Sequence, residues 1–173
     1  MRKALVVIDM LRDFMSEGGA LYCGPEARRV VGPIRGKLEA FREAGDPVIF
    51  VCDRHRPEDA EFDVFPLHCV EGTPGAEVIG ELEPREGEVI VTKRRYSGFF
   101  GTDLDITLRE LEVGELVLVG VCTDICVLYT AADARNLGYS VTVPADCVAS
   151  FDDEAHEFAL RAMERTLGVK VAR

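Results

Sequence analysis

The chain has 173 residues, the length of a single domain that buries about two thirds of its unfolded surface, and we predict one domain over residues 1–173. Hydrophobic residues make up 47% and charged residues 29%, with 8 prolines and 16 glycines, a composition that excludes disorder, collagen-like repeats and coiled coil. The formal charge of −11, from 31 acidic and 20 basic side chains, repels nucleic-acid backbones and anionic membranes, so we expect neither as a partner.

Short apolar runs rich in β-branched residues alternate with longer segments of helical periodicity. The runs predict strands over Ala4–Ile8, Val48–Cys52, Val89–Thr92 and Leu116–Val121, with shorter ones over Ser140–Val143 and Val169–Val171. Continuous apolarity predicts that these strands are buried on both faces. The helical segments are Pro33–Ala44, Thr102–Leu111, Thr123–Leu137 and Asp152–Leu167. The alternation predicts a three-layer α/β/α fold with a mostly parallel central sheet.

Glycines and a threonine mark the ends of these helices. Gly45, Gly138 and Gly168 follow three of them, where left-handed caps belong. The segment that begins at Thr102 has an acidic residue three positions later, which predicts a start of the capping-box kind.

The cysteines and the amino terminus indicate the compartment. The six cysteines are Cys23, Cys52, Cys69, Cys122, Cys126 and Cys147, and no two form a Cys-x-x-Cys pair. The first residues carry no signal-peptide pattern, and no apolar run reaches the roughly 18 residues that span a bilayer. We therefore expect a cytoplasmic protein with reduced thiols, in which Cys23, Cys52, Cys69 and Cys147 are core residues.

Reactive side chains follow the predicted strands, at the edge where parallel α/β sheets bind ligands. These residues are Asp9, Asp53, Lys93 and Cys126. With Thr123 as the N-cap, Cys126 falls at position N3, where free N–H groups and the helix dipole favour a thiolate and could hold an oxyanion. Since no histidine is placed beside Cys126, we expect Asp9 to take its proton while Lys93 keeps the pKa of Asp9 low. The pattern predicts a Cys-Asp-Lys triad.

A second group of polar residues begins at Asp53. Asp53 and His55 alternate along a strand end and so point to one side, and Glu61 and His68 could join them from the long aperiodic stretch Arg54–Pro74. Oxygen and imidazole ligands suit Zn²⁺, Mn²⁺ or Fe²⁺. The pattern alone favours the alternative that His55 and His68 only hydrogen-bond the loop together. His156, in the middle of a surface helix, is expected to be solvated.

Five segments together carry a resemblance to a known family: Val6–Phe14, Asp53–His55, Phe65–Gly75, Lys93–Leu104 and Gly120–Val127. Through them the chain resembles the isochorismatase-like cysteine hydrolases, and within these it is most similar to the nicotinamidases (pyrazinamidases) of bacteria and archaea. The Asp-x-His followed by Pro-x-His points to the nicotinamidases, because relatives that act on isochorismate do not need that metal.

The resemblance implies a Rossmann-like fold and a set of roles for individual residues. Asp9, Lys93 and Cys126 would form the triad, and the backbone N–H groups of Cys122 and Cys126 the oxyanion hole, beside a cis peptide between Val121 and Cys122. Asp53, His55 and His68 would hold a divalent metal, zinc with iron or manganese as alternatives, that orients the pyridine nitrogen of nicotinamide. The ring would lie among Phe14, Phe65 and Tyr96.

The chain departs from the family in its metal loop. Several nicotinamidases carry another histidine there, and a tryptophan where this chain has Phe65. Either Asp59 or Glu61 must then complete the metal site, and Glu61 matches relatives that have a glutamate seven residues before the last histidine.

The implied reaction is hydrolysis of a small carboxamide, nicotinamide to nicotinic acid and ammonia, in NAD recycling. The alternatives are a family member that hydrolyses another small amide, carbamoyl or ureido compound with the metal loop serving only structure, and a silent binding module, against which the intact triad argues. Assembly into a homo-oligomer stays open.

Overall fold

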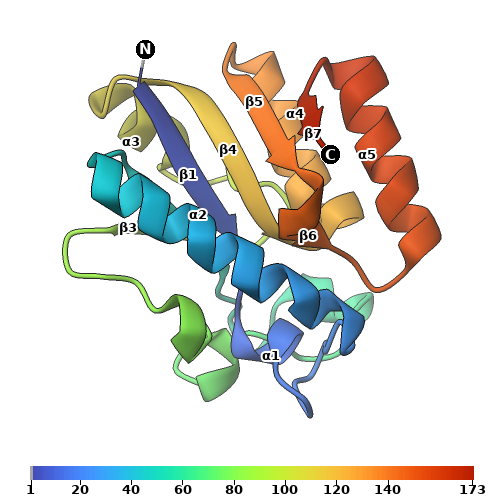
Figure 1. The fold of residues 1–173 in the computed structure, drawn as a ribbon. Helices are drawn as coiled ribbons and strands as arrows, with labels where there is room; N and C mark the ends of the chain where they lie inside the picture. Colours follow the sequence, from blue (N-terminus) through green and yellow to red (C-terminus); the bar gives the residue numbers. More distant parts are fainter. Residues whose placement is uncertain (1) are drawn as a thin grey trace.

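A seven-stranded sheet forms the middle layer of the protein, seen in a computed structural model that describes residues 2–173 (Figure 1). Its strands are β1 (Arg2–Ile8), β2 (Val48–Asp53), β3 (Val89–Lys93), β4 (Val113–Val121), β5 (Ser140–Pro144), β6 (Val148–Ala149) and β7 (Lys170–Ala172). The order is β3-β2-β1-β4-β5-β7, with β6 paired to the carboxyl end of β4, and the strand pairs are parallel. The predicted fold class is confirmed.

Helices cover both faces of the sheet (Figure 1). They are α1 (Arg12–Met15), α2 (Val31–Ala44), α3 (Leu104–Glu110), α4 (Leu128–Asn136) and α5 (Asp153–Leu167). α2 packs on one face, and α3, α4 and α5 pack on the other. Across residues 2–173, no helix combines the length and the apolarity that crossing a bilayer requires.

The central strands are apolar throughout because each of their faces meets helices. Leu5 and Val7 of β1 pack in one hydrophobic cluster with Leu38 of α2, while Val6 packs in a second cluster with Leu160 of α5. All five of these side chains are at most 1% exposed. Burial on both faces explains why the strand reads as an unbroken apolar run rather than an alternating one.

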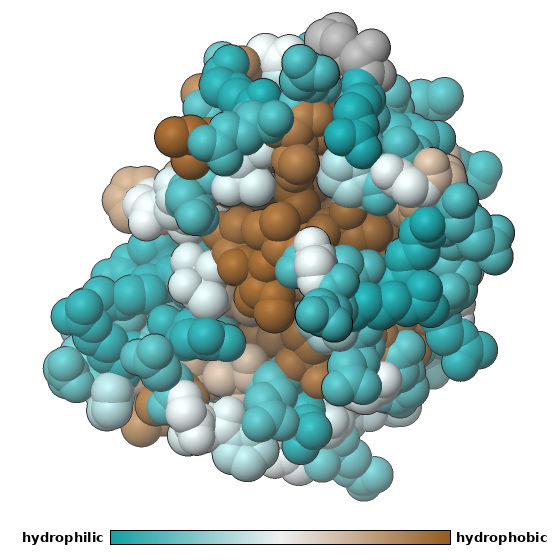
Figure 2. All heavy atoms as spheres, turned by 90° about the vertical axis from the view of Figure 1, so that its left-hand side faces the viewer, coloured by the Kyte–Doolittle hydropathy of each residue, from teal (hydrophilic) through white to brown (hydrophobic). Residues whose placement is uncertain are grey.

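β3 departs from that rule because it forms one edge of the sheet. Figure 2 looks at this side of the molecule and shows an apolar area framed by polar side chains. Ile90 of β3 is 49% exposed, whereas Val91 and Lys93 point inward and are buried. The prediction of burial on both faces is therefore wrong for β3, where one face is covered and the other is exposed. It is also wrong for β7 at the other edge of the sheet, where Lys170 and Ala172 are exposed.

Helix ends follow local chemistry in most places. Gly45 and Gly168 adopt φ of 68° and 64° just after α2 and α5, as left-handed caps. Asp152 accepts a hydrogen bond from the N–H of Ala155 and so begins α5. The predicted start at Thr102 is wrong, because α3 begins at Leu104 with Asp103 as its N-cap. The Thr102 hydroxyl donates to the Gly98 carbonyl and accepts a hydrogen bond of 3.3 Å from the Leu104 N–H.

Candidate active site

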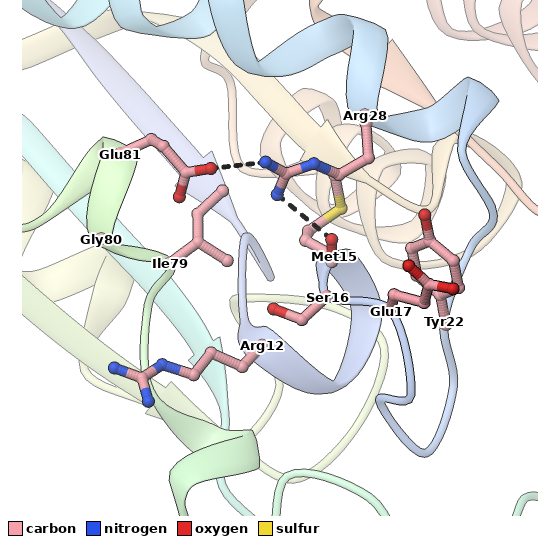
Figure 3. Close-up of a pocket in the computed structure, with 9 residues that line it drawn as sticks. All are labelled: Arg12, Met15, Ser16, Glu17, Tyr22, Arg28, Ile79, Gly80 and Glu81. Carbon is pink, nitrogen blue, oxygen red and sulfur yellow. Dashed lines mark hydrogen bonds and ion pairs between the residues drawn. The ribbon is translucent and has the colours of Figure 1, made fainter.

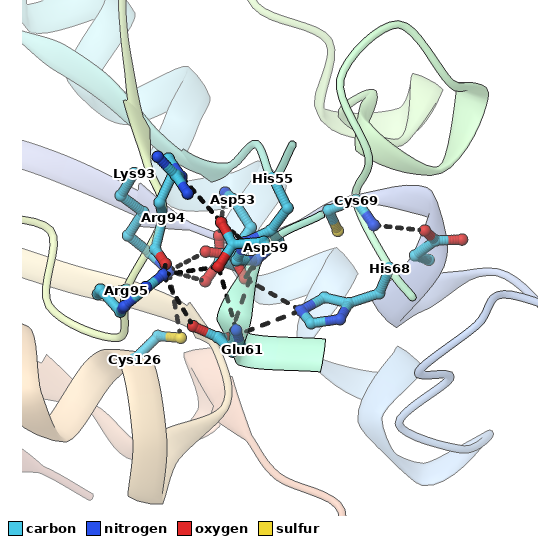
Figure 4. A network of polar contacts seen from close by, with 12 residues as sticks. Asp53, His55, Asp59, Glu61, His68, Cys69, Lys93, Arg94, Arg95 and Cys126 are labelled. Carbon is cyan, nitrogen blue, oxygen red and sulfur yellow. Dashed lines mark hydrogen bonds and ion pairs between the residues drawn. The ribbon is translucent and has the colours of Figure 1, made fainter. Parts of the chain in front are cut away.

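The carboxyl ends of the central strands bring together the four reactive side chains that the sequence singled out. Asp53 and Lys93 are paired residues at the ends of β2 and β3, and Asp9 follows β1. Cys126 lies in a single π-helical turn, Thr123–Val127, between β4 and α4. All four side chains are buried. The structure therefore places a thiol, an ammonium and two carboxylates in one water-poor site, of which Figure 4 labels Asp53, Lys93 and Cys126.

Lys93 lies at the centre of this group. Its Nζ is 2.9 Å from Asp9 Oδ2 and 3.4 Å from Cys126 Sγ, and it donates a hydrogen bond to Asp53 Oδ1. Burial alone would lower the pKa of Lys93, but the two carboxylates outweigh it and raise that pKa well above the ordinary value. Lys93 is therefore a permanent cation that contacts both the thiol and Asp9.

The pKa values of Asp9 and Asp53 are shifted in opposite directions. Burial and the charge of Asp53 raise the pKa of Asp9 to about 6, although Lys93 opposes the shift. Burial would also raise the pKa of Asp53, but Lys93 and the contacts with His55 and His68 hold it below the usual range. The expectation that Lys93 keeps the pKa of Asp9 low is wrong, because burial is the larger effect there.

The two oxygens of Asp9 differ in their surroundings. Oδ1 accepts a hydrogen bond of 2.8 Å from the Asp53 N–H. Oδ2 is buried and, among residues 2–173, accepts no hydrogen bond, although it forms the ion pair with Lys93. One Asp9 carboxylate oxygen lies within 4.8 Å of Cys126 Sγ. Asp9 thus has an acceptor position free beside the thiol.

Cys126 is a neutral thiol in this environment. Burial raises its pKa well above the ordinary value, and the nearby Lys93 offsets only part of the effect. The predicted dipole-stabilised thiolate is therefore wrong for the resting protein, since removal of water costs the charged form more than the turn contributes. Attack by the thiol requires a base.

The turn that carries Cys126 also differs from the prediction. Cys122 is the residue that caps it, with an extended backbone, so Cys126 is the fourth residue of the turn rather than the third after a Thr123 cap. The Thr123 side chain is engaged elsewhere: its oxygen lies 2.8 Å from Nδ1 of His156. His156 is therefore not simply solvated, because α5 packs against this turn.

The backbone around Cys122 is unusual. The Val121–Cys122 peptide is cis, as the resemblance implied. The Cys122 carbonyl accepts hydrogen bonds of 3.1 Å from the N–H groups of Ile125 and Val127. The N–H of Cys126, which lies between these two residues in the sequence, does not donate to this carbonyl.

Next to the thiol, four side chains converge in a way that fits a metal ion. His55 Nε2 lies 3.6 Å from Asp53 Oδ2 and 3.8 Å from Glu61 Oε1, and His68 Nε2 lies 3.7 and 3.8 Å from the same oxygens. These distances are too long for hydrogen bonds, whereas ligands about 2.0–2.2 Å from a tetrahedral ion stand about 3.3–3.6 Å apart. His55 Nε2 and Glu61 Oε2 are buried without a hydrogen-bond partner in the described chain. The donor set fits a divalent cation.

Outer contacts aim the two imidazoles at this cluster. His68 Nδ1 lies 2.8 Å from the Pro66 carbonyl, which can only accept, so Nδ1 carries the proton and Nε2 is free to coordinate. His55 Nδ1 lies 3.2 Å from Asp59 Oδ2. Asp59 thus lies behind His55, and the carboxylate that faces the cluster is Glu61. This geometry favours Glu61 over Asp59 as the fourth ligand.

The aromatic residues expected around a substrate ring line one small cavity above Cys126. Phe14, Phe65 and Tyr96 do so, and the ring centroids of Phe65 and Tyr96 are 6.4 Å apart. Its wall also includes three residues that sequence reasoning missed: Leu21, Ile125 and Phe151. Ile125 is next to Cys126 and could have been proposed from that position. Leu21 and Phe151 come from loops without a motif, and only packing brings them here.

A larger hollow of about 450 Å³ lies elsewhere on the surface (Figure 3). Both of its arginines have partners in the protein: Arg28 pairs with Glu81 and donates to the Met15 carbonyl, and Arg12 pairs with Glu77. It contains none of the reactive residues above, so we do not assign it to the chemistry.

Comparisons with known proteins identify relatives along the whole chain. Residues 3–173 match the model of the isochorismatase domain. Nicotinamidase/pyrazinamidase PncA from Bacillus subtilis is 43% identical with a TM-score of 0.94, each chain covered completely. N-carbamoylsarcosine amidase from Thermoplasma acidophilum is 41% identical (TM-score 0.91; 100% of this chain and 96% of that chain). Pyrazinamidase from Pyrococcus horikoshii in complex with zinc is 36% identical (TM-score 0.93; 100% and 99%).

Proposed function

The chain belongs to the isochorismatase family, and on that premise we propose that it is a metal-assisted cysteine amidohydrolase that converts nicotinamide to nicotinic acid and ammonia. The observation that carries the proposal is the position of Lys93, which contacts the Cys126 thiol and the Asp9 carboxylate next to a four-residue metal cluster. This reaction belongs to NAD recycling, a cytoplasmic process. Its partner is a small amide.

The first step is attack of Cys126 Sγ on the carboxamide carbon. Because the thiol is neutral at rest, its proton must leave, and Asp9 is the acceptor beside it. A pKa of about 6 leaves Asp9 ionised at neutral pH, yet makes it a stronger base than an exposed carboxylate. Lys93 stabilises the sulfur as its negative charge develops.

The second step is loss of ammonia. The backbone N–H groups of Cys122 and Cys126 stabilise the tetrahedral oxyanion, and Asp9 returns its proton to the departing nitrogen. A thioester on Cys126 remains. Water, deprotonated by Asp9, attacks this thioester and releases nicotinic acid and the free thiol.

Asp53, His55, Glu61 and His68 would hold the divalent cation. When bound, it supplies a coordination position for the pyridine nitrogen, a borderline ligand suited to Zn²⁺ or Fe²⁺. Zinc is the first choice, and the zinc complex of the pyrazinamidase from Pyrococcus horikoshii supports it. Phe14, Phe65 and Tyr96 enclose the ring, so that the carboxamide lies over Cys126.

A second candidate is hydrolysis of a small carbamoyl or ureido compound. The likeness to N-carbamoylsarcosine amidase favours it, because its identity of 41% nearly equals that of the nicotinamidase. The aromatic wall of the cavity favours nicotinamide instead, since a flat ring gains stacking contacts there that a carbamoyl group does not.

Ammonia release separates the two candidates. The purified enzyme is assayed with nicotinamide, pyrazinamide and N-carbamoyl amino acids, and Cys126→Ala supplies the blank. We expect turnover of both aromatic amides and little of the carbamoyl compounds. Hydrolysis of the carbamoyl compounds without hydrolysis of nicotinamide would overturn the proposal.

A further inference from the structure

Side chains alternate between the two faces of the sheet at the carboxyl ends of β2 and β3, so polar residues there lie on both faces. β2 alternates between the two hydrophobic clusters: Val51 faces the cluster of α4 and α5, and Cys52 faces the cluster of α2. The next residues continue the pattern, so Asp53 joins the active site and Arg54 lies on the reverse face. The same holds on β3, where Lys93 is catalytic and Arg94 follows it.

These reverse-facing residues surround a hollow of about 460 Å³. Its wall includes Arg54, Arg56, Arg94, Arg95, Glu71 and Phe100. None of these residues lines the cavity above Cys126. The hollow is therefore a separate site at the same sheet edge.

The charge of this hollow is opposite to that of the protein. The chain has a formal charge of −11, yet four guanidinium groups line one concavity in which Glu71 is the one acidic lining residue described. Arg94 and Arg95 are ion-paired with Asp59 at 2.8 and 2.9 Å, whereas Arg54 and Arg56 form no ion pair with any residue from 2 to 173. Clustered like charges repel one another, and an anion in the hollow would remove that repulsion.

The planar groups of the wall indicate what kind of anion fits. Guanidinium groups match phosphate oxygens through paired hydrogen bonds. Phe100, at the same wall, is 66% exposed, and an exposed aromatic ring offers a flat surface on which a base can stack. Phosphate and aromatic base occur together in nucleotides.

We propose that this hollow binds a nucleotide-type anion, whose phosphate groups pair with Arg54, Arg56 and Arg94 and whose base stacks on Phe100. The site has a physical link to the active site. Arg94 Nε donates to Asp59 Oδ2 at 2.8 Å, and the same oxygen lies 3.2 Å from His55 Nδ1. A phosphate that competes for Arg94 would therefore change the hold of Asp59 on His55.

Calorimetric titration of the purified, metal-loaded protein at low salt tests the proposal. The probes are adenosine diphosphate, inorganic pyrophosphate and adenosine. We expect saturable one-to-one binding of adenosine diphosphate, weaker binding of pyrophosphate, and none of adenosine. Arg54→Gln/Arg56→Gln should weaken binding of both anions about tenfold or more, because two charge-assisted contacts are lost. The thermal stability of this double variant should be unchanged or higher, because repulsion among the arginines of the hollow is relieved.

Matched controls come from α5, where Arg161 and Arg165 are exposed and form no ion pair within residues 2–173. Arg161→Gln/Arg165→Gln removes the same charge and should leave binding unchanged. Phe100→Ser should weaken adenosine diphosphate but not pyrophosphate, and Phe158→Ser, at a ring 62% exposed on α5, should change neither.

Three results would overturn the proposal: no saturable binding by the wild-type protein, equal binding by Arg54→Gln/Arg56→Gln, or an equal loss in the α5 control. Because diphosphates also bind divalent cations, metal content is measured before and after titration, and binding that scales only with metal loss counts against the site. An effect of Phe100→Ser on both anions alike would overturn the base contact. These readouts do not use hydrolysis, so their failure leaves the proposed function untouched.

Discussion

Lys93→Met should destabilise the protein strongly as well as abolish turnover. Lys93 is 1% exposed and is the cation between Asp9 and Asp53, which are both buried. Methionine has a similar length but leaves two carboxylates without their counter-ion. Breaking a buried ion pair by removal of one partner costs about 3–5 kcal/mol, and the cost here should lie in that range.

The pH dependence of this loss follows from Asp9. Its pKa is about 6 in the folded wild type, and removal of Lys93 takes away an influence that lowers it, so the variant raises it further. A carboxyl group with a raised folded pKa favours the folded state below its unfolded pKa and loses that advantage as pH rises through the folded pKa. The loss of unfolding free energy in Lys93→Met, relative to wild type, should therefore grow as pH rises above about 6.

Urea unfolding at pH 5 and pH 8 measures the effect, with a double-mutant cycle through Asp9→Asn. Lys93→Met/Asp9→Asn should recover part of the stability, because one uncompensated carboxylate is gone, but none of the activity. A Lys93→Met protein as stable as the wild type at pH 8, or a double variant no more stable than Lys93→Met, would refute the electrostatic account of the site.

Three further predictions concern the nucleophile, the metal and a distant ion pair. Cys126→Ala should abolish ammonia release while unfolding free energy changes by only about 1 kcal/mol, and Cys122→Ala should keep substantial activity because only its N–H is used; equal losses would contradict the choice of nucleophile. Asp59→Asn should lower zinc affinity about 10–100-fold in a chelator competition, since it supports His55, and an unchanged affinity would remove Asp59 from the metal site. Burial would raise the pKa of Glu88, but the ion pair with Arg42 holds that pKa below its usual range. The stability that the Arg42–Glu88 ion pair contributes is present above the unfolded pKa of Glu88, near 4.5, and is lost as pH falls. The difference in unfolding free energy between wild type and Glu88→Gln should therefore shrink between pH 6 and pH 3, and a constant difference would argue against the ion pair.

Local patterns in the sequence were sufficient for the architecture and for the place of the site. The apolar runs over Ala4–Ile8 and Leu116–Val121 and the glycine after α2 reflect contacts within a few residues, and β-branching and backbone freedom act at that range. The rule that parallel strands end at one edge then brings Asp9, Asp53, Lys93 and Cys126 together without further information.

Distances between remote segments decided the rest. Whether Glu61 or Asp59 faces the histidines, and whether burial or Lys93 dominates the pKa of Asp9, depends on separations of a few ångströms across loops far apart in the chain. Cys122 rather than Thr123 caps the turn, and the Thr123 side chain contacts His156 of α5. Electrostatic and desolvation energies change steeply over such distances, so only the packed tertiary structure determined them.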